Sequence, residues 1–231
     1  MFRTLRSPGV LLTTLLAAGI LAITMGTRQS LGLFVSPLNS ATGLGIATIS
    51  FAMAIGQFSW GAIQPVAGAV ADRYGARPVL LAAVVLLALG CAVTPFMESG
   101  FGLVVAIGLL TQLGAGGASF SVLIGAAARR LPAEARGSAS GVINAGGSFG
   151  QFVFAPILQK LIQSVGWMGA MWALAAVTLM ALPLVRVVSQ PLAEHAHHAA
   201  LLGRRTFGHA GHDPVGDPGG RLCHGRRAAD A

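Results

Sequence analysis

Apolar residues fall into six long runs within the first 188 residues, separated by short polar or glycine-containing segments. Most runs approach the ~20 residues that a helix needs to cross the hydrocarbon core of a bilayer. The sequence therefore predicts six transmembrane helices within residues 10–188, at about 10–34, 44–70, 79–96, 101–127, 138–161 and 168–188. Residues 1–9 would form a short cytoplasmic N-terminus.

The first run allows two interpretations. Arg3 and Arg6, followed by the apolar residues 10–23, are typical of a secretory signal peptide. Apolar character resumes at residues 31–35, and no convincing small-residue cleavage site precedes it, which favours a retained helix. Arg28 would then lie in the outer part of this helix, where it either faces the bundle interior or snorkels to the interface.

Three predicted helices carry small or polar residues on one face. Spacings of three, four and seven residues place side chains on the same side of a helix. Two roles fit such faces, contact between helices and the lining of a cavity. The residues concerned are Ser50, Gln57 and Gln64 in the second helix, Gln112, Gly116 and Ser119 in the fourth, and Asn144, Ser148 and Gln151 in the fifth.

Composition supports a membrane protein. Hydrophobic residues make up 54% of the chain and charged residues 10%, against about 25% charged residues in soluble domains. The net charge of +8 raises the alternative of nucleic-acid binding, but the basic residues lie at helix ends and no nucleic-acid motif accompanies them. The two cysteines, Cys91 and Cys223, imply no disulfide framework.

Charge also predicts orientation. Because cytoplasmic loops carry an excess of basic residues, the arginine-rich connections should face the cytoplasm. Both termini are then cytoplasmic, and the expected location is the plasma membrane, in a bacterium the inner membrane. Lys160 lies at the outer side, and the cytoplasmic side holds Arg3, Arg6, Arg73, Arg77, Arg129, Arg130, Arg136 and Arg186.

Two connections carry ordered motifs. The first contains Gly68, Asp72, Arg73, Tyr74, Gly75 and Arg77. This order resembles the signature loop between helices two and three of the major facilitator superfamily, whereas the positive-inside rule requires basic residues in any order. The second connection and the glycine-rich helix after it contain Pro132, the pair Arg136-Gly137, Gly141 and Pro156. This order also resembles a pattern that recurs in the same superfamily.

The resemblance covers residues 10–188 and implies an all-α membrane protein, the six-helix amino-terminal half of a twelve-helix secondary transporter. An enzyme is not expected, because all six histidines lie in the tail and no Ser/His/Asp or Cys/His constellation falls in the apolar part of the sequence, and no cofactor is expected either. No phosphate-binding Gly-x-x-x-x-Gly-Lys-Ser/Thr loop is present in the sequence, so a gradient of protons or counter-substrate would drive transport.

The resemblance also implies which residues carry function. Helices one, two, four and five line the cavity in this superfamily, so the candidate substrate contacts are Arg28, Gln57, Gln112, Asn144 and Gln151. A guanidinium with amide groups suits a small carboxylate, as in the monocarboxylate and oxalate/formate exchanger branch. A gate at the cytoplasmic side would comprise Gly68, Asp72, Arg73, Gly75, Arg77 and Arg136.

Residues 189–231 form a polar tail without an apolar run. We expect this tail to be disordered or frameshifted, and the chain to be a truncated half-transporter that need not be active alone. The alternative is a membrane-embedded assembly or binding module that pairs with another six-helix chain or with itself. Metal binding is disfavoured by the irregular spacing of His195, His197, His198, His209, His212 and His224.

Overall fold

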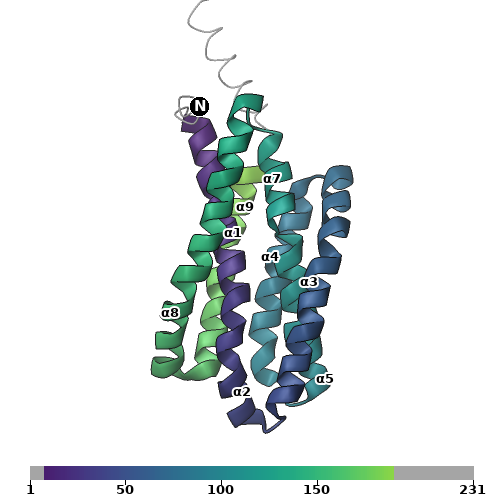
Figure 1. The fold of residues 1–231 in the computed structure, drawn as a ribbon, viewed down its shortest axis with the longest axis vertical. Coiled ribbons are helices and arrows are strands. Elements are labelled where there is room, and N and C mark those ends of the chain that lie inside the picture. Colours follow the sequence, from purple (N-terminus) through teal and green to yellow (C-terminus); the bar gives the residue numbers. More distant parts are fainter. Residues whose placement is uncertain (1–7, 190–231) are drawn as a thin grey trace, which may run out of the picture. The chain divides into compact units, whose positions relative to one another are not determined.

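The computed structural model describes residues 8–189, which are helical almost throughout (Figure 1). Within this range five stretches are long and apolar enough to cross a membrane: Gly9–Thr42, Ile46–Tyr74, Ala76–Phe96, Gly100–Ala128 and Ala133–Val188. The expectation of an all-helical membrane protein is thus confirmed. Arg3, Arg6 and the histidine-containing tail lie outside the described residues.

The first apolar stretch is longer than predicted. α1 (Pro8–Ser30) continues through a 3-10 turn, η2 (Leu31–Phe34), into α2 (Val35–Thr42), whereas the sequence placed the end of the helix near residue 34. Pro37 is tolerated because it lies in the first turn of α2. The chain reverses at Gly43 and Gly45, with φ of 66° and 85°. Arg28 therefore lies well inside the first stretch, roughly 20 Å from its end at 1.5 Å per residue.

The next two stretches agree with the predicted second and third helices to within a few residues. α3 (Ile46–Tyr74) is followed by α4 (Ala76–Val93) and a short 3-10 turn, η3 (Thr94–Phe96). Gly75 forms the turn between them with φ of 90°, a conformation that glycine adopts without strain.

The fourth stretch is not the single regular helix that the sequence predicted. α5 (Gly100–Leu103) leads into a π-helical segment, η4 (Val104–Thr111), and then into α6 (Gln112–Gly117). Ala118 and Ser119 leave the helical path, with ψ of 34° and 168°, before α7 (Phe120–Ala128) begins. This irregular stretch passes close to its neighbours, because a Cβ on Gly114 would collide with the backbone nitrogen of Leu87.

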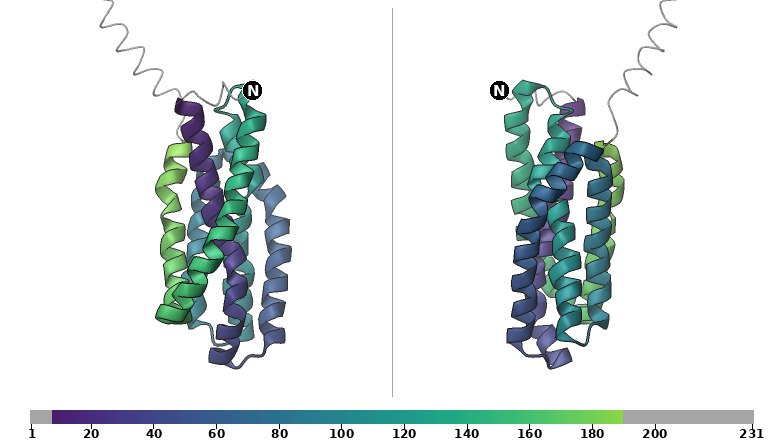
Figure 2. Two further views of the ribbon diagram at one scale, coloured as in Figure 1. Left: turned by 60° about the vertical axis from the view of Figure 1, so that its left-hand side comes forward. Right: turned by 90° about the vertical axis from the view of Figure 1, so that its right-hand side faces the viewer.

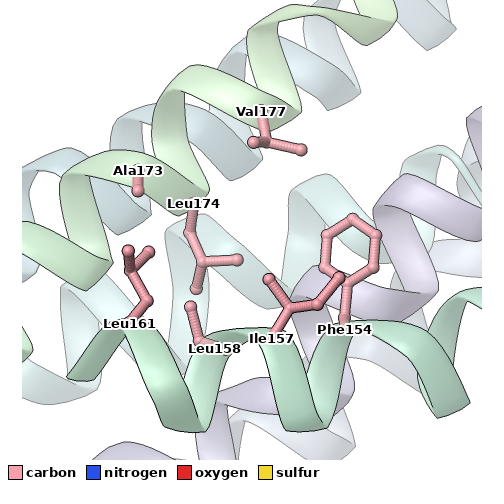
Figure 3. Close-up of a pocket in the computed structure, with 7 residues that line it drawn as sticks. All are labelled: Phe154, Ile157, Leu158, Leu161, Ala173, Leu174 and Val177. Carbon is pink, nitrogen blue, oxygen red and sulfur yellow. The ribbon is translucent and has the colours of Figure 1, made fainter. Parts of the chain in front are cut away.

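The fifth stretch contains two helical arms. α8 (Ala133–Leu179) is broken at Gly166, where φ is 78° and ψ is 169°. The chain reverses there, and the second arm, continued by α9 (Ala181–Ser189), runs back beside the first (Figure 2). A close-up shows side chains of the two arms facing each other, with Leu158 opposite Leu174 (Figure 3). The break falls between the predicted fifth and sixth helices.

α1 and the first arm of α8 pack with their backbones in close contact. A Cβ on Gly146 would lie 2.7 Å from the Cβ of Ala18, and one on Gly150 would collide with the carbonyl oxygen of Ala22. Gly26, one turn further along α1, lies against the ring of Phe154. Small residues at four-residue spacing permit such approach between membrane helices. We call this contact the α1–α8 seam.

Candidate functional site

Three helices meet at Arg28, a half-buried side chain of α1. Its Nε donates a hydrogen bond to Oε1 of Gln112 at 3.1 Å, and its Nη2 donates to Oε1 of Gln57. The guanidinium carbon lies 4.1 Å from the ring centroid of Trp60, close enough for a cation–π interaction worth about 0.5–2 kcal/mol. Two amide oxygens and an aromatic face therefore hold Arg28, and within residues 8–189 no carboxylate pairs with it.

This cluster lies near the middle of the apolar stretches. Gln57 and Trp60 are close to the midpoint of α3, and Gln112 is close to the midpoint of the fourth stretch. At 1.5 Å per residue, about 15–25 Å of helix separates each of them from either end. A charge at this depth is costly in lipid. A partner inside the bundle lowers this cost, and the contacts of Arg28 with Gln57, Gln112 and Trp60 supply one.

Local packing brings Gln112 to this position. Gly56 lies against Gln112, and a Cβ at residue 56 would stand 2.7 Å from the Cγ of Gln112. The π-helical segment η4 ends at Thr111, directly before Gln112. Such segments within helices are frequent at functional sites. Gln112 is only 5% exposed, so its amide has few alternatives to Arg28 as a partner.

A cavity of about 280 Å³ opens beside the guanidinium. We call it the arginine cavity. Its polar wall comes from α1, α3 and α6, and its apolar wall from η2 and α3. The lining residues are Arg28, Gln29, Leu31, Gly32, Met53, Gln57 and Gln112.

A second cavity, of about 230 Å³, borders Trp60. We call it the amide cavity. Its lining includes amide and hydroxyl side chains from α3, the start of α7 and the first arm of α8, and no lining residue is charged. The polar members are Gln64, Ser119, Asn144, Ser148 and Gln151, and the remaining wall is formed by Leu21, Met25, Trp60, Phe120 and Gly147.

The five predicted contact residues therefore divide into two groups. Gln57 and Gln112 hydrogen-bond to Arg28, while Asn144 and Gln151 line the amide cavity. Trp60 borders both groups, and the sequence analysis did not single it out. Its position three residues after Gln57, on the same helical face, was a signal that could have found it.

Of the residues predicted to form a gate, Gly68, Asp72 and Arg73 lie in the last two turns of α3, Gly75 in the turn after it, and Arg77 and Arg136 in the first turns of α4 and α8. Nη2 of Arg129 donates a hydrogen bond to Oδ1 of Asp72 at 2.9 Å, forming an ion pair between the end of α3 and the turn after α7. Arg73 and Arg77 are nearer to Asp72 in sequence, but within residues 8–189 its ion pair is with Arg129. The guanidinium of Arg73 lies 5.4 Å from the ring centroid of Tyr74. The ion pair is exposed, so it contributes about 0–1 kcal/mol.

Two further arginines bind backbone oxygens near these turns. Nε of Arg136 donates to the carbonyl oxygen of Leu131 at 3.2 Å. Nη1 of Arg130 donates to the carbonyl oxygen of Val187 at 3.0 Å and so ties the turn before α8 to α9. Partial burial lowers the pKa of Arg130. Gly68 has open space where a Cβ would stand, so no neighbour within the described chain requires a glycine there.

A third cavity, of about 210 Å³, lies between the two arms of α8 (Figure 3). It is lined by the apolar side chains of Phe154, Ile157, Leu158, Leu161, Ala173, Leu174 and Val177. An anion would find no hydrogen-bond donor among these side chains. We therefore assign the cavity no part in substrate binding.

Comparison with known proteins connects this arrangement to a family. The sequence profile of the Major Facilitator Superfamily matches residues 14–215. Monocarboxylate transporter 11 of Mus musculus is 31% identical over 198 residues, which is 83% of this chain and 44% of the relative. The probable galactarate/D-glucarate transporter of Escherichia coli (strain K12) is 29% identical over 148 residues, 62% of this chain and 32% of the relative. The chain thus spans less than half the length of these curated relatives.

Solved structures agree on the fold. The inward-open xylose transporter XylE from E. coli matches with a TM-score of 0.66 over 87% of this chain and 53% of XylE. The sequence identity in that match is 18%, so the likeness concerns the fold alone.

Proposed function

Since the chain belongs to the major facilitator superfamily, we propose that it forms the amino-terminal half of a secondary transporter for a small organic anion. Members with twelve helices consist of two six-helix halves with the substrate between them. A gradient of protons or of a counter-substrate would drive transport. Membership of this family of transporters argues against an enzyme.

Arg28 is the observation that carries the choice of an anion. Its present partners are the neutral amide oxygens of Gln57 and Gln112. A hydrogen bond from a guanidinium to a neutral oxygen involves one charge, whereas a carboxylate adds a second, opposite charge and can accept two parallel hydrogen bonds. A substrate carboxylate would therefore displace an amide oxygen and pair with the guanidinium through two parallel hydrogen bonds. The names of two relatives, which refer to monocarboxylate and to galactarate or D-glucarate, support this substrate class.

Propionate binding tests the role of Arg28. We expect the chain in lipid nanodiscs to bind propionate in isothermal titration calorimetry. Arg28→Gln should weaken binding at least tenfold, because a hydrogen bond to a charged group contributes about 1.5–3 kcal/mol. Arg129→Gln, which removes an exposed arginine from a turn, is the matched control and should leave the affinity unchanged. Equal propionate affinity in the parent and Arg28→Gln would exclude this role.

The proposal includes six membrane crossings with both termini in the cytoplasm of a bacterial plasma membrane. It is supported by the break at Gly166, which divides a stretch of 56 residues into two arms. The arginine-rich turns follow α3 and α7, whereas Lys160 lies near the Gly166 reversal, and basic residues favour the cytoplasmic side. Reporter fusions after Tyr74 and after Ser164 should report opposite sides of the membrane. The same side for both would reject this topology.

A second candidate role, as an assembly module, is favoured by the uncovered side of α3. Phe51 and Phe58 are 61% and 77% exposed, and Gln57 beside them is exposed as well. Lipid offers no hydrogen-bond partner to an amide, so a second six-helix chain or a second copy would cover this side better. Blue-native electrophoresis should then show a dimer. A monomer that binds propionate would instead favour the role as half of a transporter over the role as an assembly module.

A further inference from the structure

The apolar cavity between the two arms of α8 runs lengthwise between them. Leu161 and Ala173 lie at the end nearer the Gly166 reversal, and Phe154 and Val177 lie at the far end (Figure 3). Seven residues of helix separate Phe154 from Leu161, a rise of about 10 Å. Every side chain that lines the cavity is a hydrocarbon. We call this cavity the α8 groove.

The α8 groove has a buried floor and an open rim. Leu158 and Leu174 are 4% and 2% exposed, whereas Ile157 is 60% exposed. The rim lies within an apolar stretch that crosses the membrane, where no water is present to fill the groove. An unfilled groove loses van der Waals contacts along its walls. An apolar cavity of about 150 Å³ can bind a benzene molecule, so the volume of about 210 Å³ suits a segment of one hydrocarbon chain.

Polar side chains continue the open rim towards the Gly166 reversal. Ile157, Lys160 and Ser164 follow one another on one side of the first arm at spacings of three and four residues. Lys160 and Ser164 are exposed, and within residues 8–189 no carboxylate pairs with Lys160. A lysine ammonium binds phosphate, and a serine hydroxyl can donate to a phosphate oxygen. An apolar groove followed by a basic and a hydroxyl group near the end of the helix matches the acyl chain and the phosphate of a phospholipid.

We propose that the α8 groove binds one acyl chain of an anionic phospholipid, whose phosphate pairs with Lys160. The lipid belongs to the leaflet on the side of the Gly166 reversal. A helix of a second copy would also fill an apolar groove, but the lysine at the end of the rim complements a phosphate and so favours the lipid. This site is separate from Arg28, and the inference does not depend on the proposed substrate.

A phosphatidylglycerol with a photoreactive diazirine on one acyl chain tests this proposal in phosphatidylcholine nanodiscs that hold the full chain. Cross-linked peptides identified by mass spectrometry should gather within residues 154–161 and 173–177, and unlabelled phosphatidylglycerol should compete. Ala173→Phe should lower this yield roughly tenfold and keep the thermal midpoint, because its ring fills the groove and excludes the acyl chain. Ala176→Phe is the matched control, since Ala176 is exposed on the same arm and does not line the groove.

Lys160→Gln tests the phosphate contact and leaves the groove intact, so it stays decisive if Ala173→Phe destabilises the chain. It should lower the cross-linking yield about fivefold, the factor expected for one lysine beside an anionic lipid. Arg129→Gln, in a turn far along the chain from the groove, should leave the yield unchanged.

Three results would overturn the proposal. Cross-links spread evenly over the exposed helices would show that the groove holds no particular lipid. An unchanged yield in Ala173→Phe would reject the acyl-chain site, and an unchanged yield in Lys160→Gln would reject the phosphate contact. A dimer of the parent in blue-native electrophoresis that is lost in Ala173→Phe would assign the groove to a second copy instead.

Discussion

α1 contacts its neighbours in two different ways on its two sides. At the α1–α8 seam, Ala18, Ala22 and Gly26 meet the first arm of α8 by close contact of backbone and small side chains. On the other side, Arg28 meets α3 and α6 through hydrogen bonds and an aromatic ring. Gly26 and Arg28 are two residues apart, so they point about 200° apart around the helix.

The two sides differ in what can replace each contact. The seam depends on shape, and neither water nor a ligand can substitute for a backbone packed at van der Waals distance. The contacts of Arg28 are hydrogen bonds to neutral amides, which water or a carboxylate can take over. We therefore expect substitutions in the seam to act on stability, and substitutions around Arg28 to act on ligand binding as well.

The largest effect is expected from Gly150→Val in the seam. The added Cβ would collide with the carbonyl oxygen of Ala22, and a backbone atom cannot rotate away as a side chain can. Overpacking costs about 1–3 kcal/mol and occasionally more. We expect a large fall in the thermal midpoint of the detergent-solubilised chain, with loss of the monodisperse peak in size-exclusion chromatography.

Gly141→Val is the matched control for this substitution. Gly141 lies on the same arm of α8, and no atom of a neighbouring helix lies within 4 Å of the position that its Cβ would take. This variant should keep the thermal midpoint of the parent to within a few degrees. Equal destabilisation by both valines would show that general helix propensity, and not contact with Ala22, governs this arm.

Gln112→Leu should have the next largest effect, because it leaves Nε of Arg28 without its acceptor in a partly buried place. Leaving a buried donor unpaired costs about 1–3 kcal/mol. Gln57→Leu should cost less, since Gln57 is exposed and water can take over its hydrogen bond. Thermal unfolding followed by circular dichroism compares the two variants.

Gln112→Glu sharpens the same test. It restores an acceptor for Arg28, so the thermal midpoint should recover towards that of the parent. The added negative charge would neutralise the guanidinium, and propionate binding should fall. We expect the side chain of residue 112 and the substrate carboxylate to compete for Arg28. If Gln112→Glu had both the stability and the propionate affinity of the parent, this competition would be contradicted.

The sequence predicted the helices better than the site. Apolar length is a property of each segment alone, so the position of α3 and the break near Gly166 could be read without knowledge of the neighbours. The gathering of Gln57 and Gln112 around Arg28 followed from helical faces together with a family resemblance. The contact of Trp60 depends on how α1 and α3 cross, and hydrophobic patterning does not encode that crossing. The irregular step at Ser119 was hidden by the continuous apolar character of its segment.

The ion pair between Asp72 and Arg129 presents the opposite case to Arg28. Here a true carboxylate partner is present, yet the side chains are 79% and 53% exposed. Water and salt screen such pairs, and their coupling is typically 0.2–1 kcal/mol. Arg73 and Arg77 are near Asp72 in sequence, whereas its partner Arg129 comes from a turn 57 residues away.

The smallest effect is therefore expected from Asp72→Asn and Arg129→Gln. A double-mutant cycle on thermal stability should give a coupling below about 1 kcal/mol, and this coupling should decrease further in high salt. Loss of the ion pair between Asp72 and Arg129 should leave propionate binding unchanged, whereas Gln112→Glu should weaken it. A coupling above about 2 kcal/mol that resists salt would mean that another part of the protein covers the pair, because only a desolvated ion pair is that strong. These turns would then resemble the surroundings of Arg28 in energetic terms, and the contrast between centre and turns would no longer hold.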